Sequence, residues 1–414
     1  MDSPAVIAGP QAHLLKRRTG VASCDGNRKL VKLPDKDTVA PITGTIFAKA
    51  PMMETWMFEA GGPLPAPWEA AFGRIPTALQ DVYYHPGYGA SWLGWEGGRA
   101  VALWEQIEGI EYLYCVLLKE LPYRVDSHWR YDAQSFYGYG GIISSAPPVL
   151  EHLEHFNDQL DQWMQHHGVV VEFIRQHPLL HPQPMLARRA DDYAAVRTNV
   201  YADGPGIVRR QLESARRRNI AKAIASGLCV ERWDAHRGAA MFAALYHRSA
   251  LRLNMDAFYH FPEQYFHDVA SYLGQRAWYL VALLEQRPIA ALLVLAGGQT
   301  LTYHLGASDE RFWQLRPNDL LFATLLDEAA ATGYRWVSLG GGTTNDPSDS
   351  LYRYKATFGN VHLPVFVGKR VHDRRAYEHL CALWERDNPE RAEQGRRYVL
   401  RYRLGEFDRK VAVP

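Results

Sequence analysis

The sequence predicts an α/β (α+β) protein made of two tandem α/β units, each a mixed sheet flanked by helices. Three observations support this. The chain of 414 residues exceeds one ordinary core. Its 47% apolar and 22% charged residues are typical of a globular protein. One order of elements (hairpin, strand, helix, glycine, strand) occurs twice. We expect a lead-in over 1–51, units over 52–194 and 195–370, and a C-terminal helix and tail over 371–414.

In the first unit, Ser91–Trp95 and Arg99–Gln106 flank Glu96-Gly97-Gly98, which indicates a β-hairpin. Glu111–Leu118 is the next predicted strand. Residues 149–166 are apolar at helical spacing, and Gly168 stops that helix before the buried strand 169–174.

The second unit repeats this order. Its predicted elements are a hairpin of Ala277–Leu284 and Pro288–Leu295, a strand Thr300–Leu305, a helix Pro317–Thr332 ended by Gly333, and a strand Tyr334–Leu339. Between the units, Arg209–Leu228 is predicted as one amphipathic helix with a cationic face. A C-terminal helix is expected over 373–387, and the tail 396–404 is either a strand or a docking segment.

Composition excludes several classes of protein. The net charge of +1 rules out a polycation, so nucleic acid would have to meet local basic patches. The four cysteines form no CxxC pair, which argues against a zinc site and a disulfide framework and suits a reducing, cytoplasmic location. No signal peptide or membrane span is visible in the sequence. We therefore expect no metal and no bound cofactor.

The segment Leu351–Gly359, just after Gly340-Gly341-Gly342, is the strongest candidate for chemistry. It carries Lys355 among aromatic residues. A fixed cation beside a glycine loop suits a reaction in which an oxyanion develops on a carbonyl. The simpler alternative is an exposed strand lysine, paired at the surface with Asp346 or Asp349.

Five motifs in order carry a resemblance to a known family. They are Tyr137-Gly138-Tyr139-Gly140-Gly141, Glu172–Leu180, Arg218–Ala223, Arg316–Leu321, and Leu351–Lys355 with Phe358-Gly359. Over roughly residues 80–370 the chain resembles the FemABX-like branch of the GNAT acyltransferase superfamily. It has no sustained heptad run, so it looks like the subtype without a coiled-coil arm.

The resemblance implies two GNAT-like domains packed side by side, with the active cleft in or beside the second. The best-known members of this family move an amino acid from aminoacyl-tRNA onto an amine of a peptidoglycan precursor. Relatives attach amino acids or other acyl groups to small peptides and natural products.

Two catalytic candidates follow from the resemblance, and the histidine next to one of them is a third. Lys355 matches the family lysine placed against the scissile ester, and Tyr303 matches a tyrosine lining the acceptor site. His304 would take a proton from the amine. If residues alternate along this strand, only one of Tyr303 and His304 faces the cleft. A core tyrosine and an exposed histidine is the competing interpretation.

The other candidates would bind substrate. Arg316 and Asn318 open the second-unit helix, whose free N–H groups suit a phosphate, although Asn318 or Asp319 as a helix cap is equally consistent. Ordinary GNAT enzymes hold coenzyme A there on a glycine-containing loop, and the loop Asp309–Arg316 has no glycine. The remaining candidates are Arg218, Lys222, Arg252 and His260 as contacts to anionic substrate, Tyr354 beside Lys355, and Arg175 as support for the interdomain cleft. For the basic stretch from Arg209 to Lys222, the alternative is a helix face that is exposed to solvent and binds no substrate.

These residues favour an amide-forming aminoacyltransferase that works by direct attack, because neither a G-x-S-x-G elbow nor a Cys–His motif is visible. Its co-substrate would be aminoacyl-tRNA. Its acceptor would be an amine of a peptide-like natural product or a peptidoglycan precursor. One alternative is an N-acyltransferase that uses acyl-coenzyme A or an acyl carrier protein, and another is an inactive GNAT-like scaffold that binds an anionic partner.

Overall fold

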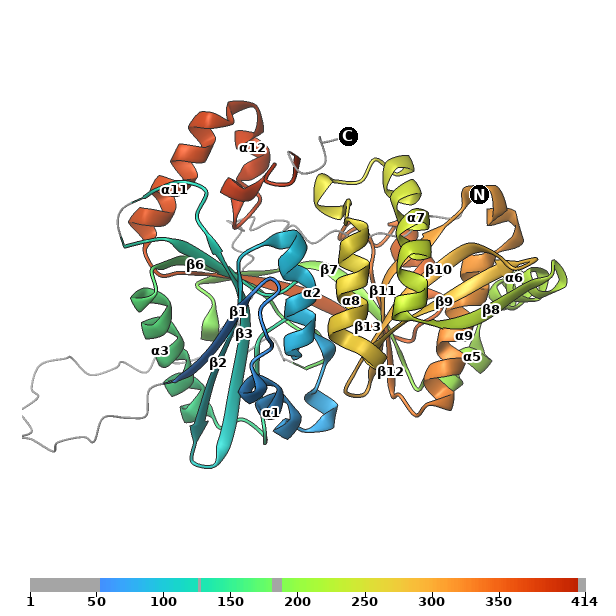
Figure 1. Cartoon of the computed structure of the whole chain (residues 1–414), viewed down its shortest axis with the longest axis horizontal. Coiled ribbons are helices and arrows are strands. Elements are labelled where there is room, and N and C mark those ends of the chain that lie inside the picture. The colour runs from blue at the N-terminus through green and yellow to red at the C-terminus, as the bar shows by residue number, and fades with distance from the viewer. Residues whose placement is uncertain (1–52, 126–127, 181–187, 409–414) are drawn as a thin grey trace, which may run out of the picture.

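The structure is a computed structural model that describes residues 53–125, 128–180 and 188–408. The predicted lead-in over 1–51 lies outside these residues. The strands form one 13-stranded mixed sheet flanked by helices, ordered β1-β2-β3-β4-β6-β13-β7-β12-β11-β10-β9-β8, with β5 paired to β3. The predicted fold class is therefore confirmed (Figure 1).

The elements alternate between helices and strands along most of the chain. The strands are β1 Glu54–Glu59, β2 Arg99–Ile107, β3 Ile110–Glu120, β4 Tyr131–Gln134, β5 Ile142–Ser144, β6 Val169–Arg175, β7 Asp192–Asp203, β8 Leu228–Asp234, β9 Ala277–Leu284, β10 Arg287–Gly297, β11 Thr300–Ser308, β12 Trp336–Gly341 and β13 Val361–Val371. The helices are α1 Ala66–Arg74, α2 Pro86–Glu96, α3 Leu150–His166, α5 Pro205–Gln211, α6 Ser214–Ala225, α7 Ala235–Arg252, α8 Glu263–Leu273, α9 Pro317–Ala331, α10 Ser350–Ala356, α11 Arg374–Asp387 and α12 Ala392–Gly395. In the described part of the chain, no helix combines the length and the apolar character that crossing a bilayer requires.

The same succession of elements builds each half of the sheet. An edge strand, two helices, a hairpin, a strand, a helix and a strand occur as β1 to β6 and again as β8 to β12. In each half the strands on either side of the third helix are parallel, β4 with β6 and β11 with β12. The two remaining long strands, β7 and β13, pair with each other at the centre and make the sheet continuous.

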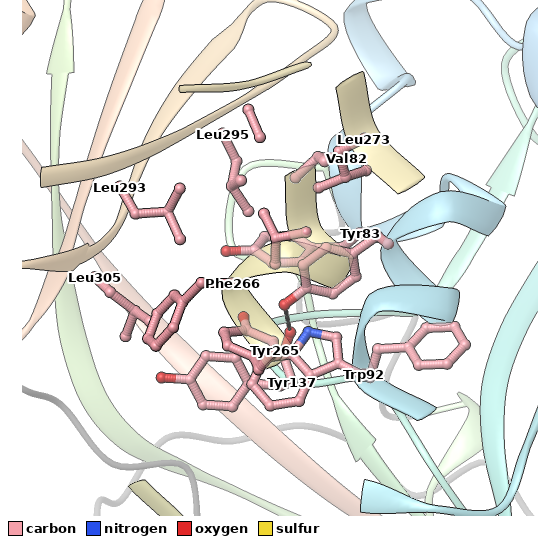
Figure 2. Close-up of a cluster of buried hydrophobic side chains, with 14 of the residues drawn as sticks. Val82, Tyr83, Trp92, Tyr137, Tyr265, Phe266, Leu273, Leu293, Leu295 and Leu305 are labelled. Atoms are coloured by element: carbon pink, nitrogen blue, oxygen red, sulfur yellow. Dashed lines mark hydrogen bonds between the residues drawn. The ribbon is translucent and has the colours of Figure 1, made fainter. Parts of the chain in front are cut away.

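An aromatic cluster packs α2 of the first half against α8 of the second (Figure 1). The ring of Trp92 lies 4.5 Å from that of Tyr137 and 4.8 Å from that of Tyr265, measured between centroids. Figure 2 shows these side chains gathered in one buried group. Large buried rings contribute most of the area that such an interface removes from water.

The predicted hairpin around Glu96-Gly97-Gly98 is wrong. Residues 86–96 form α2, which begins at Pro86 and whose N-cap His85 accepts a hydrogen bond from Gly87 N at 3.0 Å. The helix has almost no polar face because nearly all of it is buried, so its sequence shows no helical period. The hairpin lies one step further on, between β2 and β3. Its two-residue turn at Glu108-Gly109 has positive φ at both positions.

The single helix predicted over Arg209–Leu228 is also wrong. The chain forms α5 and α6 instead, and the break falls at Leu212, which is buried in the core. The last residue of the predicted helix, Leu228, already belongs to β8. Arg217, Arg218 and Lys222 lie exposed on α6, so a cationic face does exist.

The C-terminal tail docks onto the first half and is not a strand. Arg403 donates to the Asp132 carboxylate at 2.7 Å, and Lys119 pairs with Glu406 at 3.0 Å. Asp132 is fully buried. Burial raises the pKa of its carboxyl, and the charge of Arg403 opposes that rise. The tail thus supplies the countercharge for an acid inside the first half.

We predict that Arg403→Met destabilises the protein by on the order of 3–5 kcal/mol, because it leaves the buried charge of Asp132 without its partner. Arg396→Met removes an exposed arginine from the same tail and should change little. Urea denaturation measures both. Adding Asp132→Asn to Arg403→Met should restore part of the loss, and additive losses would show that the pair does not stabilise the fold.

Candidate active site

A cavity lies where β11 and β12 part. The parallel ladder between them covers only Thr300–Thr302 and Trp336–Ser338, and the strands separate beyond it. The cavity has a volume of about 60 Å³. Its lining comes from both halves: Tyr83, Tyr137, Gly138, Tyr139, Arg197, Thr302, Tyr303, His304, Leu305, Ser338, Leu339, Gly340, Gly341 and Lys355.

The structure brings the three predicted catalytic residues together in this cavity. Tyr303 and His304 are consecutive in β11, yet both line it. The register passes from Leu305 opposite Leu293 to Tyr303 opposite Val294, so His304 is an extra residue in the strand, a β-bulge. The expectation that only one of the two would face the cleft is wrong because strict alternation fails at a bulge.

Lys355 lies inside the protein, on α10. Only 2% of its surface is exposed, and its Nζ donates to Gly341 O at 2.8 Å. The same Nζ stands 5.2 Å from the centroid of the Tyr303 ring, a cation–π contact. The alternative of an exposed strand lysine is therefore wrong.

The acids proposed as surface partners of Lys355 have other roles. Asp349 caps α10 by accepting from Tyr352 N at 2.9 Å, and it also accepts from Thr343 N at 3.0 Å. Asp346 accepts from Ser348 N at 2.7 Å. Asp349 thereby fixes the start of the short helix that carries Lys355.

Burial lowers the pKa of Lys355 to about 7. The nearby positive charge of Arg197 lowers it further, while Asp349 opposes both effects. At neutral pH the side chain is therefore poised between ammonium and amine. A small change of charge in the cavity is enough to shift this balance.

The two β11 side chains stay uncharged. Burial lowers the pKa of His304 to about 3, and its Nε2 shares a hydrogen bond with Tyr265 Oη at 2.9 Å. Burial, reinforced by Tyr137, raises the pKa of Tyr303 well above its ordinary value. A neutral imidazole with so low a pKa is a weak base, so it positions a group better than it removes a proton.

Sequence reasoning missed Arg197 of β7 and the tyrosines Tyr83, Tyr137 and Tyr139 as cavity residues. Tyr137 and Tyr139 belong to a glycine-rich motif that was noticed only for its resemblance. Gly138 between them has a φ of +111°, and a Cβ there would meet the Tyr83 ring at 2.2 Å. No local pattern marks Arg197, because it is a lone basic residue in a β-strand with no glycine or proline beside it.

Several predicted substrate-binding residues lie away from the cavity. Arg218 and Lys222 are exposed on α6. Arg252 contacts Glu310 at 3.6 Å and stacks over the Trp313 ring at 4.5 Å. His260 hydrogen-bonds to Met255 O at 3.3 Å. Arg175 lines a second cavity, of about 50 Å³, which lies in the first half against the C-terminal tail.

The N-terminus of α9 is covered by the chain itself. Arg316 stands at the N-cap with a φ of +64°, and neither Asn318 nor Asp319 caps the helix. Asp319 is buried and accepts from Arg216 Nη1 at 2.7 Å and from Asn219 Nδ2 at 3.1 Å. Arg216 also lies 5.4 Å from the centroid of the Tyr354 ring. Arg216 and Asn219 of α6 thus pack over the first turn of α9, where a GNAT enzyme would hold a pyrophosphate.

The two halves repeat one order of elements, and the cavity opens where two parallel strands of the second half part. Residues 208–356 match the family model of the acetyltransferase (GNAT) domain. Residues 208–356 thus carry a GNAT acetyltransferase domain, and the fold of the chain is similar to that of FemX, as the motifs predicted.

Solved structures agree in fold. The crystal structure of FemX is 14% identical, with a TM-score of 0.60 over 79% of this chain and 99% of that one. L-PGS from Bacillus licheniformis is 10% identical, with a TM-score of 0.50 over 78% of this chain and 97% of that one. A protein of unknown function from Bacteroides thetaiotaomicron is 7% identical, with a TM-score of 0.51 over 73% and 96%. Among curated proteins, no sequence matches significantly.

The lowered pKa of Lys355 predicts a pH-dependent stability. Between about pH 7 and 10.5 the unfolded chain holds a proton that the folded chain has lost. Stability therefore rises with pH in this window, by at most about 1.4 kcal/mol per pH unit. Denaturation across the window should show this slope in the wild type and not in Lys355→Met. Arg353→Met, an exposed substitution on the same helix, should keep the slope of the wild type. Equal slopes in the wild type and both variants would contradict a lowered pKa of Lys355.

Proposed function

We propose that this acyltransferase forms amide bonds by moving an amino acid from aminoacyl-tRNA to an amine. The acceptor would be a peptide-like natural product or a peptidoglycan precursor. The observation that carries the proposal is the buried Lys355 side chain, whose Nζ donates to Gly341 O inside a cavity lined by both halves. Such a cation is the group that acyl transfer by direct attack requires.

In this mechanism the acceptor nitrogen attacks the ester carbonyl carbon of the donor, and negative charge develops on the carbonyl oxygen. The Lys355 ammonium stabilises that charge. The ester C–O bond then breaks, the leaving hydroxyl oxygen takes up a proton, and the nitrogen loses one. Tyr303 holds the lysine through its ring face, while neutral His304 orients the substrates by hydrogen bonding.

The N-terminus of α9 supports tRNA as donor over coenzyme A. Arg216 of α6 pairs with the buried Asp319 in the first turn of α9. The preceding segment Glu310–Leu315 is a 3₁₀ helix without glycine. A pyrophosphate cradle needs open backbone N–H groups at this turn. The resemblance to the FemABX-like branch, whose best-known members use aminoacyl-tRNA, favours the same donor.

The exposed face of α6 is the proposed contact for tRNA phosphates. It presents Arg217, Arg218 and Lys222, and Arg216 and Asn219 anchor the helix to α9. Basic side chains on one helix face form the electrostatic footprint expected for a polyanion.

The second candidate is an N-acyltransferase that takes its acyl group from coenzyme A or a carrier protein. The match to an acetyltransferase domain favours it. An inactive scaffold is the third interpretation, and it leaves the buried Lys355 side chain without a role.

We expect Lys355→Met to lower turnover by about 10²–10³-fold, as removal of one oxyanion-stabilising donor does. The assay supplies charged tRNA and then acyl-coenzyme A, each with a panel of amines. Amine-dependent release of deacylated tRNA supports the proposal, and thiol release supports the alternative. Absence of both indicates the scaffold. Arg353→Met is the matched control, and equal turnover in Lys355→Met and Arg353→Met would remove Lys355 from the mechanism.

Reversing charge on α6 tests the tRNA surface. Arg217→Glu with Arg218→Glu should weaken tRNA binding and flatten the dependence of log Kd on log salt, because fewer counterions are released. The matched control reverses the exposed pair Arg396 and Arg397 on the C-terminal tail. Filter binding at several salt concentrations measures the affinity and its salt dependence for each protein. A salt dependence equal to that of the control variant would show that the α6 face does not contact tRNA.

A further inference from the structure

The side chain of His304 meets the cavity on one side and helix α8 on the other. It belongs to the lining of the cavity. Its Nε2 lies 2.9 Å from the hydroxyl oxygen of Tyr265, a fully buried residue of α8. Because this hydrogen bond engages Nε2, Nδ1 is the ring nitrogen that remains for a ligand in the cavity.

Aromatic neighbours fix the orientation of the imidazole ring. The ring of His304 meets that of Tyr137 at 5.6 Å between centroids and that of Tyr88 at 6.1 Å, edge to face in both cases. The ring of Trp92 lies 6.3 Å away. Figure 2 shows Tyr137 and Trp92 in one buried group with Tyr265. In so closely packed a cluster, a ring flip that exchanged the two nitrogens would require several of these side chains to move.

The hydrogen bond between Tyr265 and His304 has a favoured direction. A phenol hydroxyl can donate or accept, and a neutral imidazole has one nitrogen of each kind. The imidazole nitrogen is the stronger base and the phenol O–H the stronger acid, so donation from Tyr265 Oη to Nε2 is the stronger arrangement. The reverse arrangement would bury the O–H of Tyr265 without an acceptor, since His304 is the one hydrogen-bond partner of this hydroxyl within the described residues. Leaving a buried donor unpaired is costly.

We infer that Tyr265 is a positioning residue: it donates to Nε2 of His304 and thereby places the single imidazole proton on Nδ1. His304 then offers the substrate an N–H donor and no acceptor. The Nζ of Lys355 lines the same cavity from α10 and is a donor whether or not it is charged. His304 and Lys355 together thus present two N–H donors to one small space.

The group that such a pair of donors suits is the carbonyl oxygen of an ester or thioester. This oxygen only accepts hydrogen bonds, and it gains negative charge when the carbonyl carbon is attacked. Burial lowers the pKa of His304 to about 3, so the ring stays neutral and keeps its donor at working pH. No proton leaves His304 in this step, and the hydrogen bond strengthens as the charge develops. On this inference, His304 does not take the proton from the amine.

The inference rests on the proposed function only in identifying the oxygen that His304 meets. The position of the imidazole proton can be measured without turnover, so the two fail separately. A chain with the proton on Nδ1 that transfers no acyl group would overturn the proposed function alone. An active chain with the proton on Nε2 would overturn this inference alone.

The tautomer is measured on the full chain labelled with ¹⁵N-histidine. Long-range ¹H–¹⁵N correlation at pH 7.5 distinguishes protonated from unprotonated ring nitrogens, and His304→Leu identifies the signals of His304 by their loss. We expect Nδ1 to carry the proton in the wild type. In Tyr265→Phe, which keeps the ring and removes the hydroxyl, signals of the Nε2–H form should appear.

Tyr246→Phe is the matched control for this measurement. Tyr246 is buried in the same cluster, and its hydroxyl has no hydrogen-bond partner within the part of the chain that the structure describes. This variant should keep the wild-type pattern. An Nε2–H form in the wild type, or an unchanged pattern in a folded Tyr265→Phe, would overturn the inference.

Turnover tests what the tautomer does. Tyr265→Phe should lower kcat by about tenfold with KM nearly unchanged, because the hydrogen bond from His304 matters most once charge has developed. Adding Tyr265→Phe to His304→Leu should cause no further loss, since Tyr265 acts only through His304. Tyr246→Phe should turn over at the wild-type rate. Additive losses in the double variant, or equal losses in Tyr246→Phe and Tyr265→Phe, would reduce Tyr265 to a packing role and overturn the inference.

Discussion

The hydrogen-bonded ladder between β7 and β13 is the constraint on which the rest of the molecule depends. It joins two sheets of the same design into one, since β13 pairs with β6 on its other side and β7 pairs with β12. It also builds the site. Arg197 stands on β7 opposite Val365, and Lys355 lies on the helix that leads into β13. The turn between α10 and β13 passes so close to β7 that a Cβ on Gly359 would lie 2.3 Å from Val200 Cγ1. Only glycine permits this approach.

The cavity belongs to the pair of halves and not to the second half alone. The match to a GNAT domain covers 208–356, yet Tyr83, Tyr137 and Tyr139 of the lining come from the first half. The aromatic packing of α2 against α8 holds these side chains in place. Burial in the cavity lowers the pKa values of Lys355 and His304. The first half thus completes the wall of a cavity whose lysine the second half supplies.

The parts of the fold with a clear period were predictable from the sequence, and the parts without one were not. The hairpin β9–β10 and the helix α9 lie within a residue or two of their predicted positions, because turn residues and the helix signals Pro317 and Gly333 mark them. Helix α2 was missed since it is buried on all sides. Lys355, Tyr303 and His304 were found through a family motif. Tyr303 and His304 line the same cavity because of a β-bulge. Arg197 and Lys355 are brought together by the pairing of β7 with β13, which are far apart in the sequence. No local pattern encodes either arrangement.

The docked tail has a consequence for the order of events during synthesis. Two features of the first half depend on residues much later in the sequence. Strand β6 pairs with β13 at residues 361–371, and Asp132 accepts a hydrogen bond from Arg403. A ribosome synthesises these residues after the whole of the first half. The first half therefore cannot reach its final structure while the second is still being translated, although its own residues emerge first. Nascent chains should carry an open β6 edge and an unneutralised Asp132 until β13 and Arg403 have left the ribosome, so the first half completes its folding only after the second half has been made.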